Sequence, residues 1–316
     1  SDLHKKQRWP QAAAEYERVS AEAEDPALGR ESLLLAGELY EESAVGDSAL
    51  DVYLRYVEQY PEPVEIAVET RYKIAGMYRE AVDFEAYHAQ LEHIVRMDGE
   101  AGDGRTARTR YLAAQSSLVL AEVTFRLFDD IELMQPFEQS LQAKQVGMDE
   151  TIAALERLVD YEVAEVTAAA TYYMAETYRD FSRSLLESER PADLSGAELQ
   201  DYEMVLEEEA WPFEERAIEV HEKNLELMVA GHFNPWIEKS LGELAGLMPG
   251  RYAKFEESSG FIVSIDSYAY RSPSAPVREL EEPALEDASG EPVEPLSEPE
   301  PEVTEETPVG EAVVTG

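Results

Sequence analysis

Small and aromatic residues recur at fixed offsets in residues 30–63, and this pattern restricts the fold more than any other feature of the chain. Gly37 and Tyr40 share one helical face, and Ala49 and Tyr53 share another. A small residue lets two antiparallel helices approach closely, and an aromatic residue on the partner helix fills the groove beside it. A proline soon after Tyr53 ends the second helix. The segment therefore predicts a tightly packed helix hairpin.

The same hairpin pattern recurs on both sides of this segment. Downstream, Gly37 corresponds to Ala75, Tyr40 to Tyr78, Ala49 to Tyr87, and Tyr53 to Leu91. Upstream, residues 10–23 predict a helix in which Ala12, Tyr16 and Val19 take the places of Ala49, Tyr53 and Tyr56. We therefore expect the sequence to begin at the second helix of a repeat, within a longer protein.

The spacing of these residues resembles that of the tetratricopeptide repeat (TPR). Counted from Arg30 as position 1, the positions 8, 11, 20, 24 and 32 are held by Gly37, Tyr40, Ala49, Tyr53 and Pro61. The TPR is a helix hairpin of about 34 residues with small, aromatic and proline residues near these positions. The resemblance implies an all-α solenoid of TPR-like helix pairs, wound as a right-handed superhelix, that binds other proteins.

Two further segments resemble TPR proteins of the bacterial cell envelope. One is YPEP with the following AxxxRYKIAGMY, in residues 60–78. The other is residues 212–252, which resemble the C-terminal part of large TPR proteins found with TonB/ExbB/ExbD- or Tol–Pal-type systems. The resemblance implies a place in the periplasm or cell envelope, with the cytoplasm as the alternative.

The repeat pattern and the composition together divide the chain into four segments. We expect TPR repeats in residues 1–98, divergent TPR-like helical repeats in 99–254, an extended arm in 255–271 and a tail in 272–316. Within the second segment, helices are expected over residues 105–131 and 163–186. Further helices are expected to begin at Pro136, after a cap at Asp149, after a capping box at Ser195 and Glu198, and at Trp211-Pro212. The last helix is expected to end at Met248.

The last two segments differ sharply from the helical part. Residues 261–270 are β-branched and aromatic, which predicts an extended arm that packs on the last helices or pairs with a strand of a partner. Residues 272–316 contain 13 acidic residues, one arginine, 8 prolines and no aromatic residue. Such a segment cannot bury enough apolar surface to offset its chain entropy, so we expect a disordered acidic tail.

The charge of the chain restricts its partners. The sequence has 68 acidic and 26 basic side chains, a net charge of −42, and no cysteine. Such a protein is repelled by nucleic acid and by anionic lipid, and it favours a protein partner with a basic segment. No apolar run approaches the ~20 residues of a membrane helix, so we expect no direct membrane insertion.

No motif of catalysis or metal binding is complete in the sequence. The glycine-rich residues 99–104 lack the acidic positions of a calcium loop. His221-Glu222 begins like the zinc motif HExxH, but its last position is Leu225. No phosphate-binding loop, dinucleotide turn or nucleophile elbow is present. We therefore expect no enzyme activity, no cofactor and no metal site.

Taken together, the sequence predicts a non-catalytic scaffold for protein–protein interaction in a bacterial envelope complex. Two alternatives remain open: a structural cap of a longer solenoid without its own binding site, and an envelope hydrolase. Tyr56 and Tyr172 are candidates for lining the binding surface, and Arg71 and Lys73 are candidates for a basic clamp on a partner's carboxylate. We predict these four residues as the partner-binding site.

Overall fold

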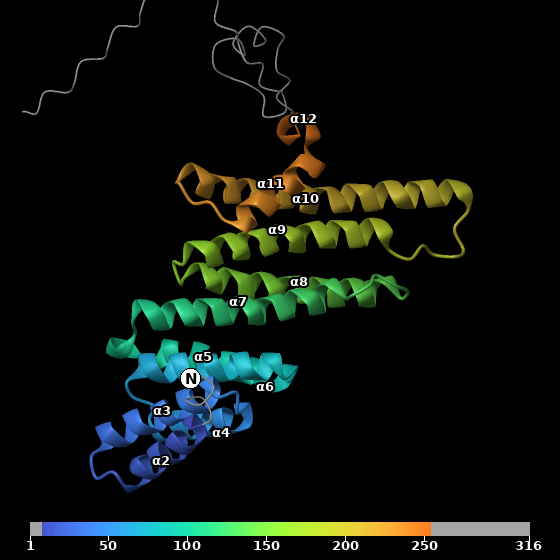
Figure 1. Ribbon diagram of the computed structural model, residues 1–316. Coiled ribbons are helices and arrows are strands. Elements are labelled where there is room, and N and C mark those ends of the chain that lie inside the picture. The colour runs from blue at the N-terminus through green and yellow to red at the C-terminus, as the bar shows by residue number, and fades with distance from the viewer. Residues whose placement is uncertain (1–7, 254–316) are drawn as a thin grey trace, which may run out of the picture. The chain divides into compact units, whose positions relative to one another are not determined.

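The computed structural model describes residues 8–253, and within them every regular element is helical (Figure 1). The α-helices are α2 (Trp9–Glu22), α3 (Pro26–Glu42), α4 (Gly46–Gln59), α5 (Val64–Glu80), α6 (Phe84–Glu100), α7 (Ala107–Asp129), α8 (Phe137–Val159), α9 (Ala164–Glu187), α10 (Gly196–Val229), α11 (Pro235–Leu247) and α12 (Pro249–Tyr252). The predicted all-α architecture is confirmed for these residues. The expected arm at 255–271 and the acidic tail at 272–316 lie outside them.

The helices pack in chain order, so that successive hairpins stack on one another (Figure 1). Each helix contacts the next one along the chain. In addition α5 contacts α7, α7 contacts α9, and α9 contacts α11, whereas no comparable contact joins even-numbered helices among those described. The odd-numbered helices from α5 onward therefore form a continuous layer, and the even-numbered helices stand beside it one by one.

The core is divided into four clusters along the stack. The first contains Tyr53 and Tyr56, the second Leu91 and Ile94, the third Leu155 and Ala169, and the fourth Phe128 and Phe181. Each cluster joins neighbouring hairpins and none spans the whole array. This is the arrangement of a repeat protein, whose stability is a sum of contacts between neighbours. None of the described helices has the length and apolar character needed to cross a membrane.

The hairpin predicted from residues 30–63 is present as α3 and α4. Gly37 and Ala49 are buried, and the ring of Tyr53 lies directly against Gly37. The Tyr40 hydroxyl donates to Glu17 of α2 over 2.8 Å, which ties this hairpin to the preceding helix. The small and aromatic residues act here as their spacing predicts.

Two helix boundaries predicted from local signals are wrong. Asp149 does not cap a helix but lies inside α8, which is continuous. Gly147, in the same helix, lies against the segment that follows α7, because a Cβ there would lie 3.1 Å from Ile131. Likewise Pro212 does not restart a helix but lies inside α10. The adjacent Phe213 packs at a tilt against Phe181 of α9, with the ring centroids 4.5 Å apart. The capping box of Ser195 and Glu198 at the start of α10 is confirmed.

The contact of Gly37 with Tyr53 yields a stability prediction. A Cβ at Gly37 would lie 2.5 Å from Cε1 of Tyr53, so Gly37→Ala is expected to destabilise the protein by about 1–3 kcal/mol. Gly76, in the equivalent helix of the next hairpin, has no heavy atom within 4 Å of such a Cβ. Gly76→Ala is therefore expected to stabilise by about 0.5–1 kcal/mol. Urea unfolding followed by circular dichroism measures both, and equal effects of the two substitutions would contradict the proposed packing.

Candidate binding groove

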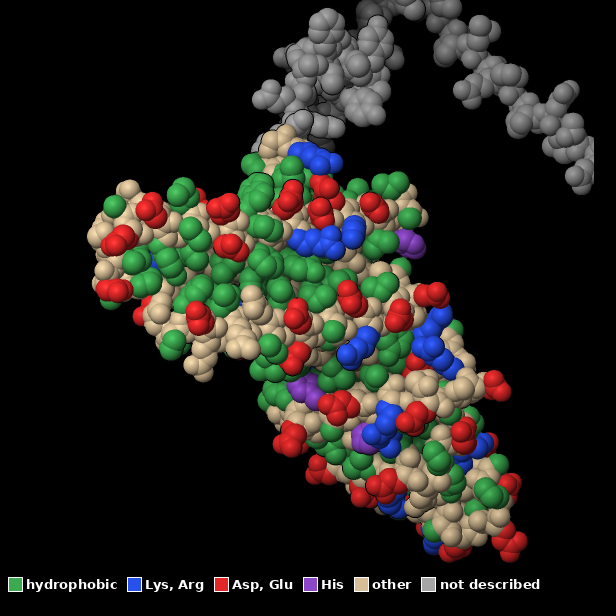
Figure 2. Space-filling view, turned by 180° about the vertical axis from the view of Figure 1, so that it is seen from behind, with side chains coloured by type: hydrophobic (Ala, Val, Ile, Leu, Met, Phe, Trp, Pro, Cys, Tyr) green, Lys and Arg blue, Asp and Glu red, His purple; other side chains and the backbone are tan. Residues whose placement is uncertain are grey.

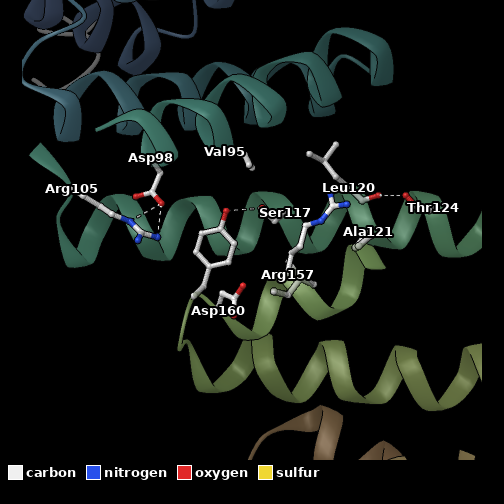
Figure 3. A pocket seen from close by; sticks show the side chains of 13 residues that line it. Val95, Asp98, Arg105, Ser117, Leu120, Ala121, Thr124, Arg157 and Asp160 are labelled. Carbon is white, nitrogen blue, oxygen red and sulfur yellow. Dashed lines mark hydrogen bonds and ion pairs between the residues drawn. The ribbon is translucent and has the colours of Figure 1, made fainter. Parts of the chain in front are cut away.

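A groove of about 480 Å³ lies over α7, between α6 and the C-terminal end of α8 (Figure 3). We call it the α6–α8 groove. Its apolar floor and walls are Val95, Leu120, Ala121, Ala154 and Leu158. It exists because the odd-numbered helices touch one another while α6 and α8 do not make a comparable contact. Three segments that are far apart in the sequence therefore line one depression.

One wall of the groove is held by a buried carboxylate. Asp98, only 1% exposed at the end of α6, accepts hydrogen bonds from Arg105 Nε at 3.0 Å and from Thr109 Oγ1 at 2.8 Å. Arg105 Nη2 lies 2.8 Å from the same carboxylate, and this pairing raises the pKa of Arg105. The pair fixes the turn between α6 and α7. Asp98 also compensates the positive charge of Arg105, so this arginine is not available to pair with a carboxylate of a partner.

Arg157 on α8 is different. Its side chain is exposed and extends into the groove toward Leu120 (Figure 3), and it forms no ion pair with any residue in the described part of the chain. Beside it the Tyr161 hydroxyl shares a 3.1 Å hydrogen bond with Ser117. A guanidinium group binds a carboxylate through two parallel hydrogen bonds. The groove can therefore accept an acidic group next to an apolar one.

The four residues predicted as the partner site do not come together. Tyr56 has no exposed surface, so its ring belongs to the first core cluster and cannot line a binding surface in this conformation. On α5, Arg71 faces α6 and donates to Gln90 over 2.9 Å. Lys73 faces α3 instead, with its ammonium group 3.6 Å from Glu38. The two basic residues thus point to different neighbours and form no joint clamp.

Tyr172 lies at the other end of the stack, on the layer of odd-numbered helices. Its ring packs against Trp236 of α11 with the centroids 5.6 Å apart, and the Lys239 ammonium lies 5.5 Å from its centroid. Burial, followed by the charge of Glu176, raises the pKa of Tyr172 to about 12. The tyrosine is half-buried, and it mainly joins α9 to α11.

A buried charged cluster was missed at the sequence level. Lys144 has no exposed surface and lies 2.6 Å from the Asp180 carboxylate, while it also donates to the carbonyl of Phe128 at 3.0 Å. Arg183 pairs with the same aspartate and lies 3.5 Å from Asp129, whose pKa is raised by burial and by the neighbouring Asp180. Its position on the helix could have revealed that Lys144 is buried. Lys144 lies on the face of α8 that also carries core residues of the third and fourth clusters.

A second buried polar cluster joins α9, α10 and α11. His221 shares hydrogen bonds of 3.2 Å with Ser240 and with Glu176. Asn224 donates to Ser240 over 2.9 Å. The order of serine, histidine and glutamate is that of a hydrolytic triad, but neither Ser240 nor His221 has exposed surface, so a substrate cannot reach them in this conformation. In this arrangement the cluster binds three helices together.

Within residues 8–253, no three histidine or acidic side chains lie close enough to hold a metal ion. Comparison with known proteins adds little. No family model matches the chain, and no curated protein matches it. A solved structure described as "Computational Design of Self-Assembling Cyclic Protein Homooligomers" covers 77% of this chain and 91% of its own, at 15% identity and a TM-score of 0.24. A similarity this low supports no conclusion about fold or function.

The buried lysine gives a second prediction. Lys144→Met removes the buried ammonium group and leaves Asp180 with the half-exposed Arg183 as its remaining cation, so we expect a loss of about 3 kcal/mol in the free energy of unfolding. Arg18 is the control, because its pair with Glu15 is largely exposed. Arg18→Met is expected to cost less than about 1 kcal/mol. Chemical denaturation of both variants tests this, and similar losses would contradict a stabilising role for the buried pair.

The surroundings of His93 give a pH prediction. Burial, then the charges of Arg71 and Arg96, lower the pKa of His93 below its ordinary value of about 6.5. The folded state therefore binds this proton less readily than the unfolded state, so His93 costs stability as the pH falls through these values. Arg71→Gln removes one positive charge. We expect it to raise the pKa of His93 partway toward the ordinary value and to reduce the loss of stability in acid.

An NMR titration of the His93 ring checks the shift. Arg79→Gln is the control, since Arg79 lies on the same helix but does not contribute to the lowered pKa of His93. An unchanged pKa in the Arg71→Gln protein would show that the charge of Arg71 does not contribute to the lowered value.

Proposed function

We propose that this chain is a TPR-type scaffold that binds another protein, and that the α6–α8 groove receives a segment of that partner. The observation that carries the proposal is Arg157, an arginine without an ion pair among the described residues, beside the apolar floor of an open groove. In a chain with a net charge of −42, the other arginine that lines this groove, Arg105, is already paired with Asp98. An uncompensated one is therefore suited to a ligand.

The groove defines the chemistry of the bound segment. An apolar side chain fits the surface of Leu120 and Leu158, and a carboxylate beside it pairs with Arg157. Outside the groove the acidic surface favours basic residues in the same partner. The proposed partner is thus a protein segment with an apolar and an acidic residue in the groove and basic residues around it.

The envelope setting belongs to the same proposal. It is supported by the resemblance of residues 60–78 and 212–252 to envelope TPR proteins found with TonB/ExbB/ExbD- or Tol–Pal-type systems. We propose a periplasmic or envelope complex on that basis. The chain would act there without catalysis, since its serine–histidine–glutamate cluster is enclosed.

The absence of cysteine allows a direct test. Thr124→Cys places a single thiol inside the groove, and Glu92→Cys places one on the exposed side of α6. Each carries a photo-activated cross-linker and is mixed with an envelope extract of the native host. We expect one specific adduct from position 124 alone, because only that site lies where the partner segment binds.

The role of Arg157 is tested in the same assay. Arg157→Glu is expected to abolish the adduct from position 124, and the control Lys223→Glu, an exposed lysine on α10, is expected to retain it. If both labelled sites capture the same proteins, or if Arg157→Glu changes nothing, the groove is not a binding site. That result would favour the alternative of a structural cap.

A further inference from the structure

A second groove lies one hairpin further along the stack, in the equivalent place. It has a volume of about 290 Å³ and lies over α9, between the start of α8 and the first half of α10. We call it the α8–α10 groove. Its main lining residues are Phe137, Leu141, Phe181, Leu185, Val205 and Phe213. As with the first groove, two even-numbered helices form the walls and the odd-numbered helix between them forms the floor.

This groove is an opening into the fourth core cluster. Phe181 and Leu185 on its floor are 1% and 5% exposed, whereas Val205 on its rim is 52% exposed. The Tyr202 hydroxyl beside it is buried and has no hydrogen-bond partner among the described residues. Figure 2 shows hydrophobic side chains gathered over this end of the stack, with acidic side chains around them. A large apolar side chain from outside would extend the cluster.

The walls have the geometry that accepts a helix. On α10 the lining residues Tyr202, Val205, Glu209 and Phe213 follow one another at helical spacing along one face, and α8 contributes a second such row. Two rows of side chains on neighbouring helices form ridges, and a third helix packs its own ridge between them. Helix-in-groove binding uses this arrangement.

The charge around the groove selects the kind of helix. Between Gly196 and Glu215, α10 contains eight acidic residues and no lysine or arginine. The basic side chains nearby are already paired, in the ion pairs Lys144–Asp180, Arg183–Asp180 and Arg190–Glu203. Glu209, which lines the groove, is therefore left without a cation from the described part of the chain.

We propose that the α8–α10 groove binds a basic amphipathic helix of another protein, with a large apolar residue in the groove and lysine or arginine facing Glu209. The acidic C-terminal residues 272–316 are unsuited, because they carry 13 acidic residues and one basic residue. A second copy of this chain is disfavoured by its own net charge of −42. The inference rests on the proposal that the chain is a scaffold, but it concerns a separate groove, at which the partner places a basic rather than an acidic residue.

The probe is a fluorescent amphipathic peptide of leucine and lysine, about 18 residues long so that it forms a helix. Its binding to the full chain is followed by fluorescence anisotropy. One control peptide has glutamate in place of lysine, and another has the same composition in scrambled order. We expect the leucine–lysine helix to bind at least about tenfold more tightly than either control. Equal binding of the scrambled peptide would overturn the proposal, since it would show charge attraction alone.

Two pairs of variants locate the site. Val205→Glu adds a negative charge at the rim, so charge attraction alone predicts equal or tighter binding, whereas docking in the groove predicts a loss of about tenfold. Val229→Glu, at an 87% exposed position on the same helix, is expected to have no such effect. Glu209→Lys is expected to weaken binding and Glu226→Lys, also exposed on α10, to leave it nearly unchanged. Circular dichroism confirms that each variant is folded.

The outcomes separate this inference from the proposed function. Equal effects of Val205→Glu and Val229→Glu would overturn it. So would a dimer that sediments as such in the native protein and is lost in the Val205→Glu variant, since the groove would then serve a second copy. Arg157→Glu should leave peptide binding intact, and Val205→Glu should leave the adduct from position 124 intact. If the otherwise unaltered protein gives no specific adduct from position 124 but still binds the peptide, only the α6–α8 groove is rejected.

Discussion

Close approach of neighbouring helices at small residues is the constraint on which the rest of this structure depends. A Cβ at Gly29 would lie 2.8 Å from the Tyr60 hydroxyl, and one at Gly37 would lie still closer to the ring of Tyr53. Contacts of this kind hold the two helices of a hairpin together. From α5 onward the odd-numbered helices also touch one another in a layer. The even-numbered helices are left apart as a result, and both grooves lie in the spaces between them.

Much of this fold could be predicted from residues 30–63, because the pattern there describes contacts within one hairpin. Gly37 and Tyr53 touch as expected, and the next hairpin repeats the arrangement. The errors at Asp149 and Pro212 have one cause. A cap or a proline is a local signal, and packing against a neighbouring helix, as by Phe213 on Phe181, outweighs it. TPR membership and the envelope setting remain predictions, since they rest on resemblance.

The candidate site was much less predictable. A groove forms where three helices meet, and the spacing within any one of them does not show which side chains will face the space. Arg157 lies near the end of a helix that sequence signals divided in two, and nothing local distinguishes it from a solvated arginine. Tyr56 was predicted to line the binding surface, but its ring is buried. An aromatic residue suits a binding surface and a core equally well, so the sequence pattern does not separate the two. His221 and Lys144 could be found only by counting helical positions toward the core.

The buried ion pair of Lys144 has a consequence for how the stack finds its correct alignment. Successive hairpins of a repeat protein present similar apolar faces, so a helix could in principle settle one turn, about 5.4 Å, away from its proper place. Lys144 meets the Phe128 carbonyl at the end of α7 and the Asp180 carboxylate on α9 at the same time. A shift of α8 along either neighbour would leave an ammonium ion buried without a counterion, which is strongly unfavourable. The ion pair is therefore satisfied in only one alignment of α7, α8 and α9, although their apolar faces are similar.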